Sequence, residues 1–182
     1  MRVISGKLKS RRLSVPRNFP SRPTTDFAKE GLFNILENKI DLEDIEVLDL
    51  CSGTGNIAFE FISREAKKVT CVDINVPCIK HISKTALEIG LKHQIETVKD
   101  DICNFLKRTD SVYNIIFADP PYDLDIHEQI VYLVYQKHML SPEGILIIEH
   151  GKKTDLSHLP AFENVRNFGN VYFSFFRSTN IN

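Results

Sequence analysis

The chain has 182 residues, of which 42% are hydrophobic and 26% are charged, and these values are ordinary for a globular protein. They exclude wholesale disorder and favour one domain with at most a small appendage. No apolar run approaches the roughly 20 residues that a membrane helix needs, and the sequence after Met1 is polar and basic rather than signal-like, so we expect a cytoplasmic protein without a membrane partner.

Charge is distributed unevenly along the chain. The net charge is −1, but residues 1–30 contain eight Lys and Arg residues against two acidic ones, a net +6, which leaves −7 for the remainder. A basic arm on an acidic body indicates a polyanionic partner. Short β-like pieces at 3–4 and 13–15 surround a turn-prone basic centre and predict a small hairpin. We therefore expect a basic N-terminal hairpin and connector over residues 1–23 and a main domain over residues 24–182.

Strands and helices are predicted to alternate through the main domain. Thr24, Thr25 and Asp26 can cap a helix that runs to about residue 38. Strands are then expected over 47–51, 69–73, 95–98, 113–118 and 144–149, with intervening helices over 56–64, 77–90, 101–107 and 124–138. Such alternation predicts an α/β fold with a mostly parallel sheet covered on both faces. Segments 165–168 and 171–177 flank Gly169-Asn170 and predict an antiparallel hairpin at one edge of the sheet.

The cysteine pattern gives no metal signature. The chain contains no CxxC pair. We interpret the cysteines as reduced thiols in predicted strands or helices, and we expect no metal site. They are Cys51, Cys71, Cys78 and Cys103.

Acidic residues recur at the carboxyl ends of the predicted strands. Asp49, Asp73, Asp101 and Asp119 all lie at or beside such ends. In open α/β sheets, ligands bind at this edge, where the strand order reverses. The repetition predicts one shared acidic site.

A glycine-rich loop follows the first strand of the main domain. Residues 53–58 match G-x-G-x-x-A, which lets the backbone pass close to a ligand. Asp73 follows Gly53 by 20 residues, where a carboxylate can accept both hydroxyls of a ribose. The motif therefore predicts an adenosine-containing cofactor, either a dinucleotide or S-adenosylmethionine. Asp49 would repel a pyrophosphate but suits the cationic methionine end of S-adenosylmethionine, and Asp101 can accept from an adenine amino group, so the methyl donor is favoured.

The apolar run 115–118 ends in Asp119-Pro120-Pro121-Tyr122. Proline donates no amide hydrogen and holds φ at about −65°, and it drives the preceding residue towards an extended conformation. The tetrapeptide therefore predicts rigid acceptors beside an aromatic ring, which suit a planar group that carries an NH2. The alternative is a strand that simply ends in a Pro-Pro turn.

Together, these motifs resemble class I S-adenosylmethionine-dependent methyltransferases, and the 119–122 tetrapeptide resembles the [DN]-PP-[FYW] motif of enzymes that methylate exocyclic or amide nitrogens. The N-terminal sequence narrows the resemblance. It is similar to the RsmD family of 16S rRNA guanine-N2 methyltransferases at Arg2-Val3-Ile4-Ser5-Gly6, Leu13, Val15-Pro16, Arg22-Pro23-Thr24-Thr25-Asp26 and Leu32-Phe33-Asn34.

The resemblance implies a Rossmann-like sheet, S-adenosylmethionine as cofactor, and methylation of a guanine N2 in 16S rRNA, within the assembling or assembled small subunit. We expect a monomer. The catalytic residues would be Asp119, Pro120, Pro121 and Tyr122. The cofactor would be held by Asp49, Ser52, Gly53, Gly55, Asp73, Ile74, Asp101 and Ile102. RNA would be bound by Arg2, Lys7, Lys9, Arg11, Arg12, Arg22 and Thr24.

Two other functions compete with this interpretation. The same tetrapeptide serves methylation of adenine N6 or of a protein glutamine, although DNA enzymes of that kind usually carry a target-recognition domain for which this length leaves no room. A catalytically inert, RNA-binding assembly factor is the second alternative, and the intact 119–122 tetrapeptide argues against it.

Overall fold

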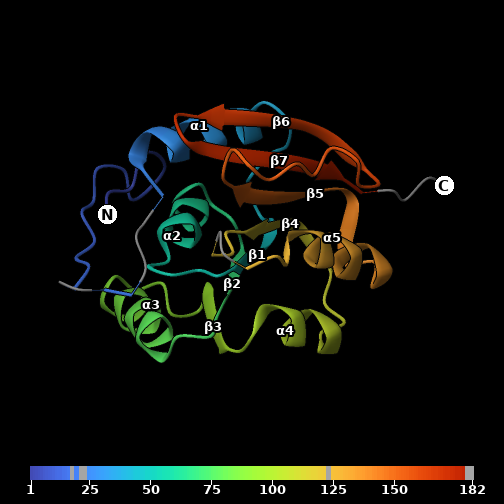
Figure 1. The fold of residues 1–182 in the computed structure, drawn as a ribbon. Coiled ribbons are helices and arrows are strands. Elements are labelled where there is room, and N and C mark those ends of the chain that lie inside the picture. The colour runs from blue at the N-terminus through green and yellow to red at the C-terminus, as the bar shows by residue number, and fades with distance from the viewer. Residues whose placement is uncertain (17–18, 21–23, 122–123, 179–182) are drawn as a thin grey trace.

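Seven strands form one sheet in the order β3-β2-β1-β4-β5-β7-β6 in the computed structural model, which describes residues 1–16, 19–20, 24–121 and 124–178 (Figure 1). The strands from β3 to β5 run parallel, and β7 is antiparallel to both β5 and β6. This confirms the predicted α/β fold with an antiparallel hairpin at one edge. The strands are β1 (Glu46–Leu50), β2 (Lys68–Asp73), β3 (Ile95–Lys99), β4 (Tyr113–Ala118), β5 (Leu140–His150), β6 (Phe162–Phe168) and β7 (Val171–Arg177).

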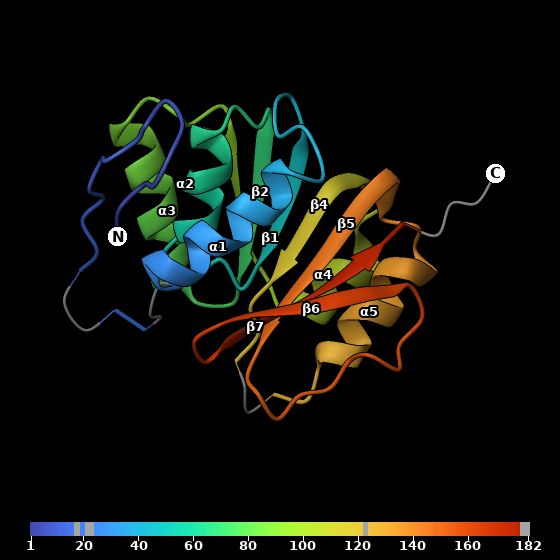
Figure 2. The same cartoon turned by 90° about the horizontal axis from the view of Figure 1, so that it is seen from above.

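Helices cover both faces of the sheet, as Figures 1 and 2 show. Three helices pack in the core on one face and two in the core on the other face. The first group is α1 (Asp26–Glu37), α2 (Asn56–Ser63) and α3 (Val76–Glu88), and the second is α4 (Ile102–Arg108) and α5 (His127–Gln136). In α1, the Thr25 hydroxyl accepts from the Ala28 N–H at 3.2 Å, which confirms a cap within the predicted Thr-Thr-Asp string.

The central strands bury both of their faces. Successive side chains of a strand point to opposite faces, so Ile115 and Phe117 of β4 join the core under α1–α3, whereas Ile116 and Ala118 join the core under α4 and α5. The apolar run that looked like one buried strand in the sequence therefore fills two cores. This double burial fixes the register of β4 and the direction in which residue 119 leaves the sheet.

Element boundaries differ most from the prediction around β5. The strand begins at Leu140 rather than at 144, and α5 begins at His127 rather than at 124. Pro142 lies within the early part of β5, where the pairing with β4 shifts register between Tyr113 and Ile115. A bulge of this kind accepts a proline that lacks a ladder hydrogen bond, so the strand continues through a sequence that reads as a turn.

The N-terminal arm, residues 1–16, forms a hairpin-like loop held by one antiparallel bridge, between Arg2 and Arg12. Its backbone docks on the end of α2: the Lys7 N–H donates to the Ser63 carbonyl at 2.7 Å. Gly6 has φ +79°, and a Cβ there would lie 1.8 Å from the Ser63 carbonyl oxygen. Only glycine permits this close approach.

A buried ion network ties the arm to helices α1 and α2. The Lys29 ammonium donates to the Arg2 carbonyl at 2.6 Å and to the Asn56 side chain at 2.8 Å, and it lies 3.1 Å from Glu60. The Glu60 carboxylate also accepts from the Ile4 N–H and pairs with Arg64. Asn56 is the first residue of α2 and directly follows Gly55. Lys29 therefore connects the arm to the end of the glycine-rich loop.

Candidate active site

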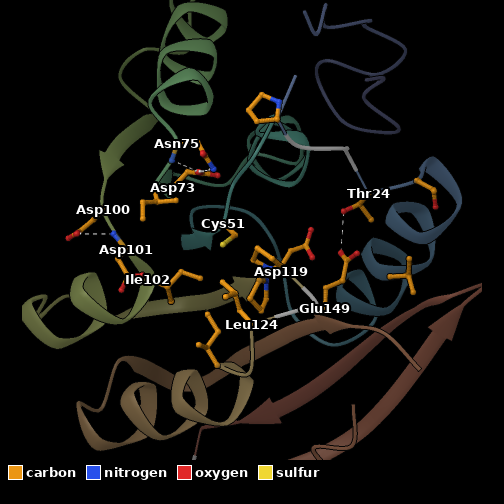
Figure 3. Close-up of a pocket in the computed structure, with 17 residues that line it drawn as sticks. Thr24, Cys51, Asp73, Asn75, Asp100, Asp101, Ile102, Asp119, Leu124 and Glu149 are labelled. Carbon is orange, nitrogen blue, oxygen red and sulfur yellow. Dashed lines mark hydrogen bonds between the residues drawn. The ribbon is translucent and has the colours of Figure 1, made fainter. Parts of the chain in front are cut away.

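A cavity of about 550 Å³ lies at the carboxyl ends of the parallel strands, where the strand order reverses between β1 and β4 (Figure 3). This is the position where open α/β sheets bind ligands. The structure brings together in its wall predicted residues that lie up to 97 positions apart in the sequence, from 24 to 121. They are Thr24, Asp73, Ile74, Asp101, Ile102, Asp119, Pro120 and Pro121.

The glycine-rich loop supports the cavity from behind rather than lining it. Asp49, Ser52, Gly53 and Gly55 are absent from the wall, and Cys51 is the loop residue that reaches it. The Ser52 hydroxyl donates to the Asp49 carbonyl at 2.6 Å, which closes the turn. Gly55 has φ +75°, and a Cβ there would come within 2.9 Å of the Phe59 ring, so a side chain would push α2 away from the loop.

The Asp73 carboxylate is held in place by three hydrogen bonds at the end of β2. It accepts from the Gly53 N–H at 2.9 Å, from the Asn75 N–H at 2.8 Å and from the Asn75 side-chain amide at 3.0 Å. Figure 3 shows the Asp73–Asn75 contact at the cavity wall. A carboxylate fixed in this way is a preorganised acceptor for hydroxyl groups.

Asp101 and two isoleucines form the neighbouring wall. Asp101 caps α4, because its carboxylate accepts from the Asn104 N–H at 3.0 Å. Ile74 follows β2 and is 57% exposed, and Ile102 opens α4 and is buried. Apolar side chains beside a carboxylate suit a flat ring that carries an amino group.

Asp119 follows β4 directly, and its N–H donates to the Leu50 carbonyl of β1 at 3.2 Å. Burial raises the pKa of Asp119 from 3.8 to about 7. Pro120 and Pro121 follow in the cavity wall. Tyr122, predicted to stack on the substrate, lies outside the described residues.

Asp49 is buried beside these acids, and its Oδ2 atom has no hydrogen-bond partner among the residues that the structure describes. Burial, then the charges of Asp119 and Asp73, raise the pKa of Asp49 well above its usual range. Carboxylates that raise one another's pKa are relieved by a nearby cation. An acidic cluster with an unused acceptor therefore fits a ligand with a positively charged end.

Glu149 is a cavity residue that the sequence analysis missed. It lies near the end of β5, it is 4% exposed, and it accepts a hydrogen bond from the Thr24 hydroxyl at 3.2 Å (Figure 3). The signal that finds the four aspartates, an acid at the carboxyl end of a predicted strand, also applied to Glu149. The next residue, His150, is instead buried against β7, where its Nε2 lies 2.7 Å from the Ser174 hydroxyl.

The basic side chains of the arm lie outside the cavity wall. They are exposed on the arm's surface, although Arg2 pairs with Asp26 at 3.1 Å and Lys7 contacts Gln94 at 3.2 Å. Arg22 lies outside the described residues. The exposed basic residues of the arm are Arg2, Lys7, Lys9, Arg11 and Arg12.

The described part of the chain carries neither a membrane-spanning helix nor a metal-binding cluster. Within residues 1–16, 19–20, 24–121 and 124–178, every helix is too short or too polar to cross a membrane. The same residues contain no group of three His, Cys, Asp or Glu side chains arranged to hold a metal ion.

Comparison with known proteins gives matches over nearly the whole chain. The family model described as "Conserved hypothetical protein 95" matches residues 1–177. A Haemophilus influenzae protein named "Ribosomal RNA small subunit methyltransferase D" is 31% identical over 159 residues, which cover 86% of this chain and 81% of that protein. An Escherichia coli protein of the same name is 29% identical over 161 residues, which cover 88% and 80% of the two chains.

A solved structure extends the match to the fold. The structure titled "Putative methyltransferase yhhF from Escherichia coli" is 26% identical, has a TM-score of 0.86, and the match covers 98% of this chain and 97% of that one. With the class I methyltransferase fold, the acidic cavity and a family match over residues 1–177 in agreement, the chain belongs to the RsmD family of ribosomal RNA small subunit methyltransferases.

Proposed function

We propose that this chain transfers the methyl group of S-adenosylmethionine to the exocyclic N2 of a guanine in 16S rRNA of the small ribosomal subunit. One observation carries the proposal: Asp119, Pro120 and Pro121 share a single cavity with Asp73 and Asp101. The first three residues suit an amino group on a flat ring, and the other two suit an adenosine. The relatives named methyltransferase D support the substrate class.

The donor side of the cavity fits S-adenosylmethionine in charge and shape. When bound, this cofactor supplies a methyl group already activated by a sulfonium. Asp73 would accept from the ribose hydroxyls, and Asp101 would accept from the adenine amino group between Ile74 and Ile102. Asp49, which has an unused buried acceptor, would neutralise the cationic methionine end. Ser52, Gly53 and Gly55 would act by shaping the loop that holds Asp49 and Asp73.

The acceptor side makes the amine a better nucleophile. The lone pair of an aryl amine is delocalised into its ring, so a planar NH2 attacks poorly. The Asp119 carboxylate and the Pro120 carbonyl would accept the NH2 hydrogens and favour a pyramidal nitrogen. Methyl transfer would leave the nitrogen cationic and release the demethylated cofactor, and Asp119 would accept the proton that the nitrogen then loses. Alignment supplies much of the acceleration, and Tyr122 would stack on the base.

The arm would hold the RNA through its phosphates and leave base selection to the cavity. The target base must leave its stack, which costs a few kcal/mol unless it is already unpaired. In this division of labour, residues 1–23 bind RNA and residues 24–182 carry the chemistry. We propose that the protein acts as a monomer in the cytoplasm, where ribosomal subunits assemble.

The test is methyl transfer to small subunits isolated from cells that lack the enzyme. Labelled S-adenosylmethionine should label 16S rRNA at one guanine, and nuclease digestion with mass spectrometry should identify N2-methylguanine. Label in N6-methyladenine or in a protein glutamine would replace the proposal with one of its competitors. An absence of label with both free rRNA and assembled subunits would favour the non-catalytic assembly factor.

A further inference from the structure

The chemistry of the 119–122 tetrapeptide accounts for an amino group but not for the choice of base. Asp119 and the Pro120 carbonyl can accept the NH2 hydrogens of guanine, adenine or cytosine equally. A residue that makes guanine the preferred substrate must contact a different atom of the base. Polar groups that line the same cavity are in reach of such an atom.

Glu149 lies beside Asp119, close enough to contact a second atom of the same base. Ala118 of β4 pairs with Ile148 of β5, so Asp119 and Glu149 occupy the next positions along two neighbouring parallel strands, which lie about 4.8 Å apart. By strand alternation, both side chains lie on the sheet face of Phe117 and Ile147, which is the face under α1–α3. Figure 3 shows both at the same part of the cavity wall.

Glu149 is also oriented. Its carboxylate is 4% exposed and accepts a hydrogen bond from the Thr24 hydroxyl at 3.2 Å. A carboxylate can accept about four hydrogen bonds over its two oxygens, and the contact with Thr24 fixes one of these oxygens at the cavity wall. Thr24 itself belongs to the segment that joins the RNA-binding arm to α1.

The bases differ in what they offer to such a pair of acceptors. Guanine carries two adjacent donors on its Watson–Crick edge, N1–H and the N2 amino group. Adenine and cytosine place an unprotonated ring nitrogen beside their amino group, and a carboxylate facing that nitrogen would meet a lone pair. A flipped base is read on this edge.

We infer that Glu149 accepts the N1–H of the target guanine while Asp119 accepts from its N2 amino group, which makes Glu149 the specificity-determining residue of this site. The inference rests on the proposed function. It explains how one chain can use a tetrapeptide common to several amino-methylating enzymes and still select guanine. A buried carboxylate left facing an acceptor costs far more than a missing methylene, because its polar group stays unpaired.

The test changes the Watson–Crick edge of the substrate base. Small subunits are reconstituted with 16S rRNA that carries either guanine or 2-aminopurine at the methylated position. 2-Aminopurine keeps the 2-amino group but lacks O6 and has an unprotonated N1, and the Glu149 variant below separates the N1 contact from any contact to O6. Wild-type enzyme should methylate guanine roughly 100-fold faster than 2-aminopurine. Equal rates on both bases would overturn the inference without any variant, whereas failure to methylate guanine would overturn the proposed function instead.

Glu149→Gln then reverses the hydrogen bond, because the glutamine amide can donate to N1 of 2-aminopurine. The ratio of the guanine rate to the 2-aminopurine rate should fall by roughly 10- to 100-fold. A folding defect lowers both rates together, so an unchanged ratio would contradict the inference. Thr24→Val is the matched control. It removes the orienting hydroxyl and keeps the carboxylate, so it should lower the rate on guanine without reversing the preference, and a ratio altered as strongly as in Glu149→Gln would assign the selection to Thr24.

Discussion

We expect Asp49 to link the stability of the ligand-free protein to its affinity for the cofactor. Burial and the charges of Asp119 and Asp73 raise its pKa, so the folded state retains a proton that the unfolded chain has already lost. The folded state then binds more protons than the unfolded state, and the free energy of unfolding falls as pH rises above 3.8. Burial of Asp119 adds to this loss between 3.8 and about 7.

Asp49→Asn should flatten this pH dependence. Without cofactor at pH 8, we expect a free energy of unfolding higher by about 1 kcal/mol or more, and a Tm higher by a few degrees. The same variant should bind S-adenosylmethionine roughly 10-fold more weakly, because Asn keeps an acceptor oxygen but loses the negative charge that would neutralise the cationic methionine end. Thermal unfolding at pH 5 and pH 8 measures the change in stability, and titration calorimetry measures the affinity for S-adenosylmethionine. The control is Asp110→Asn, whose side chain is 90% exposed, and an equal pH slope in the two variants would contradict the assignment.

For single residues, the sequence predicts which chemical groups form the site better than it predicts which residues contact one another. The spacing of acids at strand ends led to Asp73, Asp101 and Asp119 in one cavity. It did not show that Gly53 and Gly55 act through turn geometry, or that Cys51 adopts φ 60° and reaches the cavity wall. Those facts depend on backbone dihedrals, which residue type constrains only weakly for cysteine.

Among the elements, the contact between the arm and α2 depends on Lys29, which is 1% exposed. Burial lowers its pKa, while the charge of Glu60 raises it. Removing one partner of a buried ion pair leaves the other charge uncompensated. Among the described residues, the Glu60 carboxylate would retain Arg64 and the backbone amides of the arm.

Lys29→Met should therefore destabilise the protein by about 3 kcal/mol and loosen the arm. Chemical denaturation measures the first effect, and the rate of trypsin cleavage after Arg11 and Arg12 in the folded protein measures the second. Lys39→Met is the control, because Lys39 pairs with Glu163 at the surface, where such a pair contributes about 1 kcal/mol or less. Equal stability of the two variants would contradict the anchoring role of Lys29.

The elements were predictable where hydrophobic periodicity was strong. Strand β4 has the predicted bounds, and the edge hairpin β6–β7 turns at Gly169-Asn170 as expected. The early part of β5 was not predictable, because Pro142 within a strand requires a bulge in its pairing with β4. The arm has a single bridge instead of two regular strands, since some of its backbone amides, among them those of Ile4 and Lys7, donate to residues of α2 instead.

For the whole molecule, charge distinguishes the basic arm, which we propose binds RNA, from the acidic cavity, which we propose carries out the chemistry. Replacing both Arg11 and Arg12 with Gln should weaken binding to 16S rRNA, with a salt dependence that is shallower by about two counterions. The affinity for S-adenosylmethionine should stay unchanged. Filter binding across a salt series measures the RNA affinity and its salt dependence, and calorimetry measures the affinity for S-adenosylmethionine.

The matched control removes two positive charges from the opposite side of the molecule. Lys107 and Lys137 lie together at the ends of α4 and α5, where the Lys137 ammonium donates to the Lys107 carbonyl at 3.1 Å. Their replacement with Gln should leave RNA affinity almost unchanged. An equal loss in the control would mean that net charge, rather than the arm, determines binding.

The topology of the whole chain was predictable because parallel strands with helical crossovers admit few arrangements. The strand order, and with it the reversal between β1 and β4, places the ends of segments from 24 to 149 around one cavity. Sequence alone could not place Thr24 against Glu149, since that contact joins residues 125 positions apart and depends on how α1 crosses the sheet.

The central claim is that Asp119 acts on the substrate amine and not on the cofactor. Single-turnover methyl transfer to small subunits, at saturating S-adenosylmethionine, tests it most directly. For Asp119→Ala we predict a rate at least about 100-fold lower with cofactor affinity within about threefold of wild type. Asp119→Asn keeps an acceptor oxygen but has no group that titrates, so it should retain part of the rate.

The pH profile completes the measurement. In our proposal the ionised form of Asp119 is the acceptor, and burial raises the pKa of Asp119 to about 7. The wild-type rate should therefore rise with pH up to about 7 and then level off. The Asp119→Asn rate should not show this rise. Normal turnover by Asp119→Ala, or a parallel loss of cofactor binding and transfer, would contradict the account.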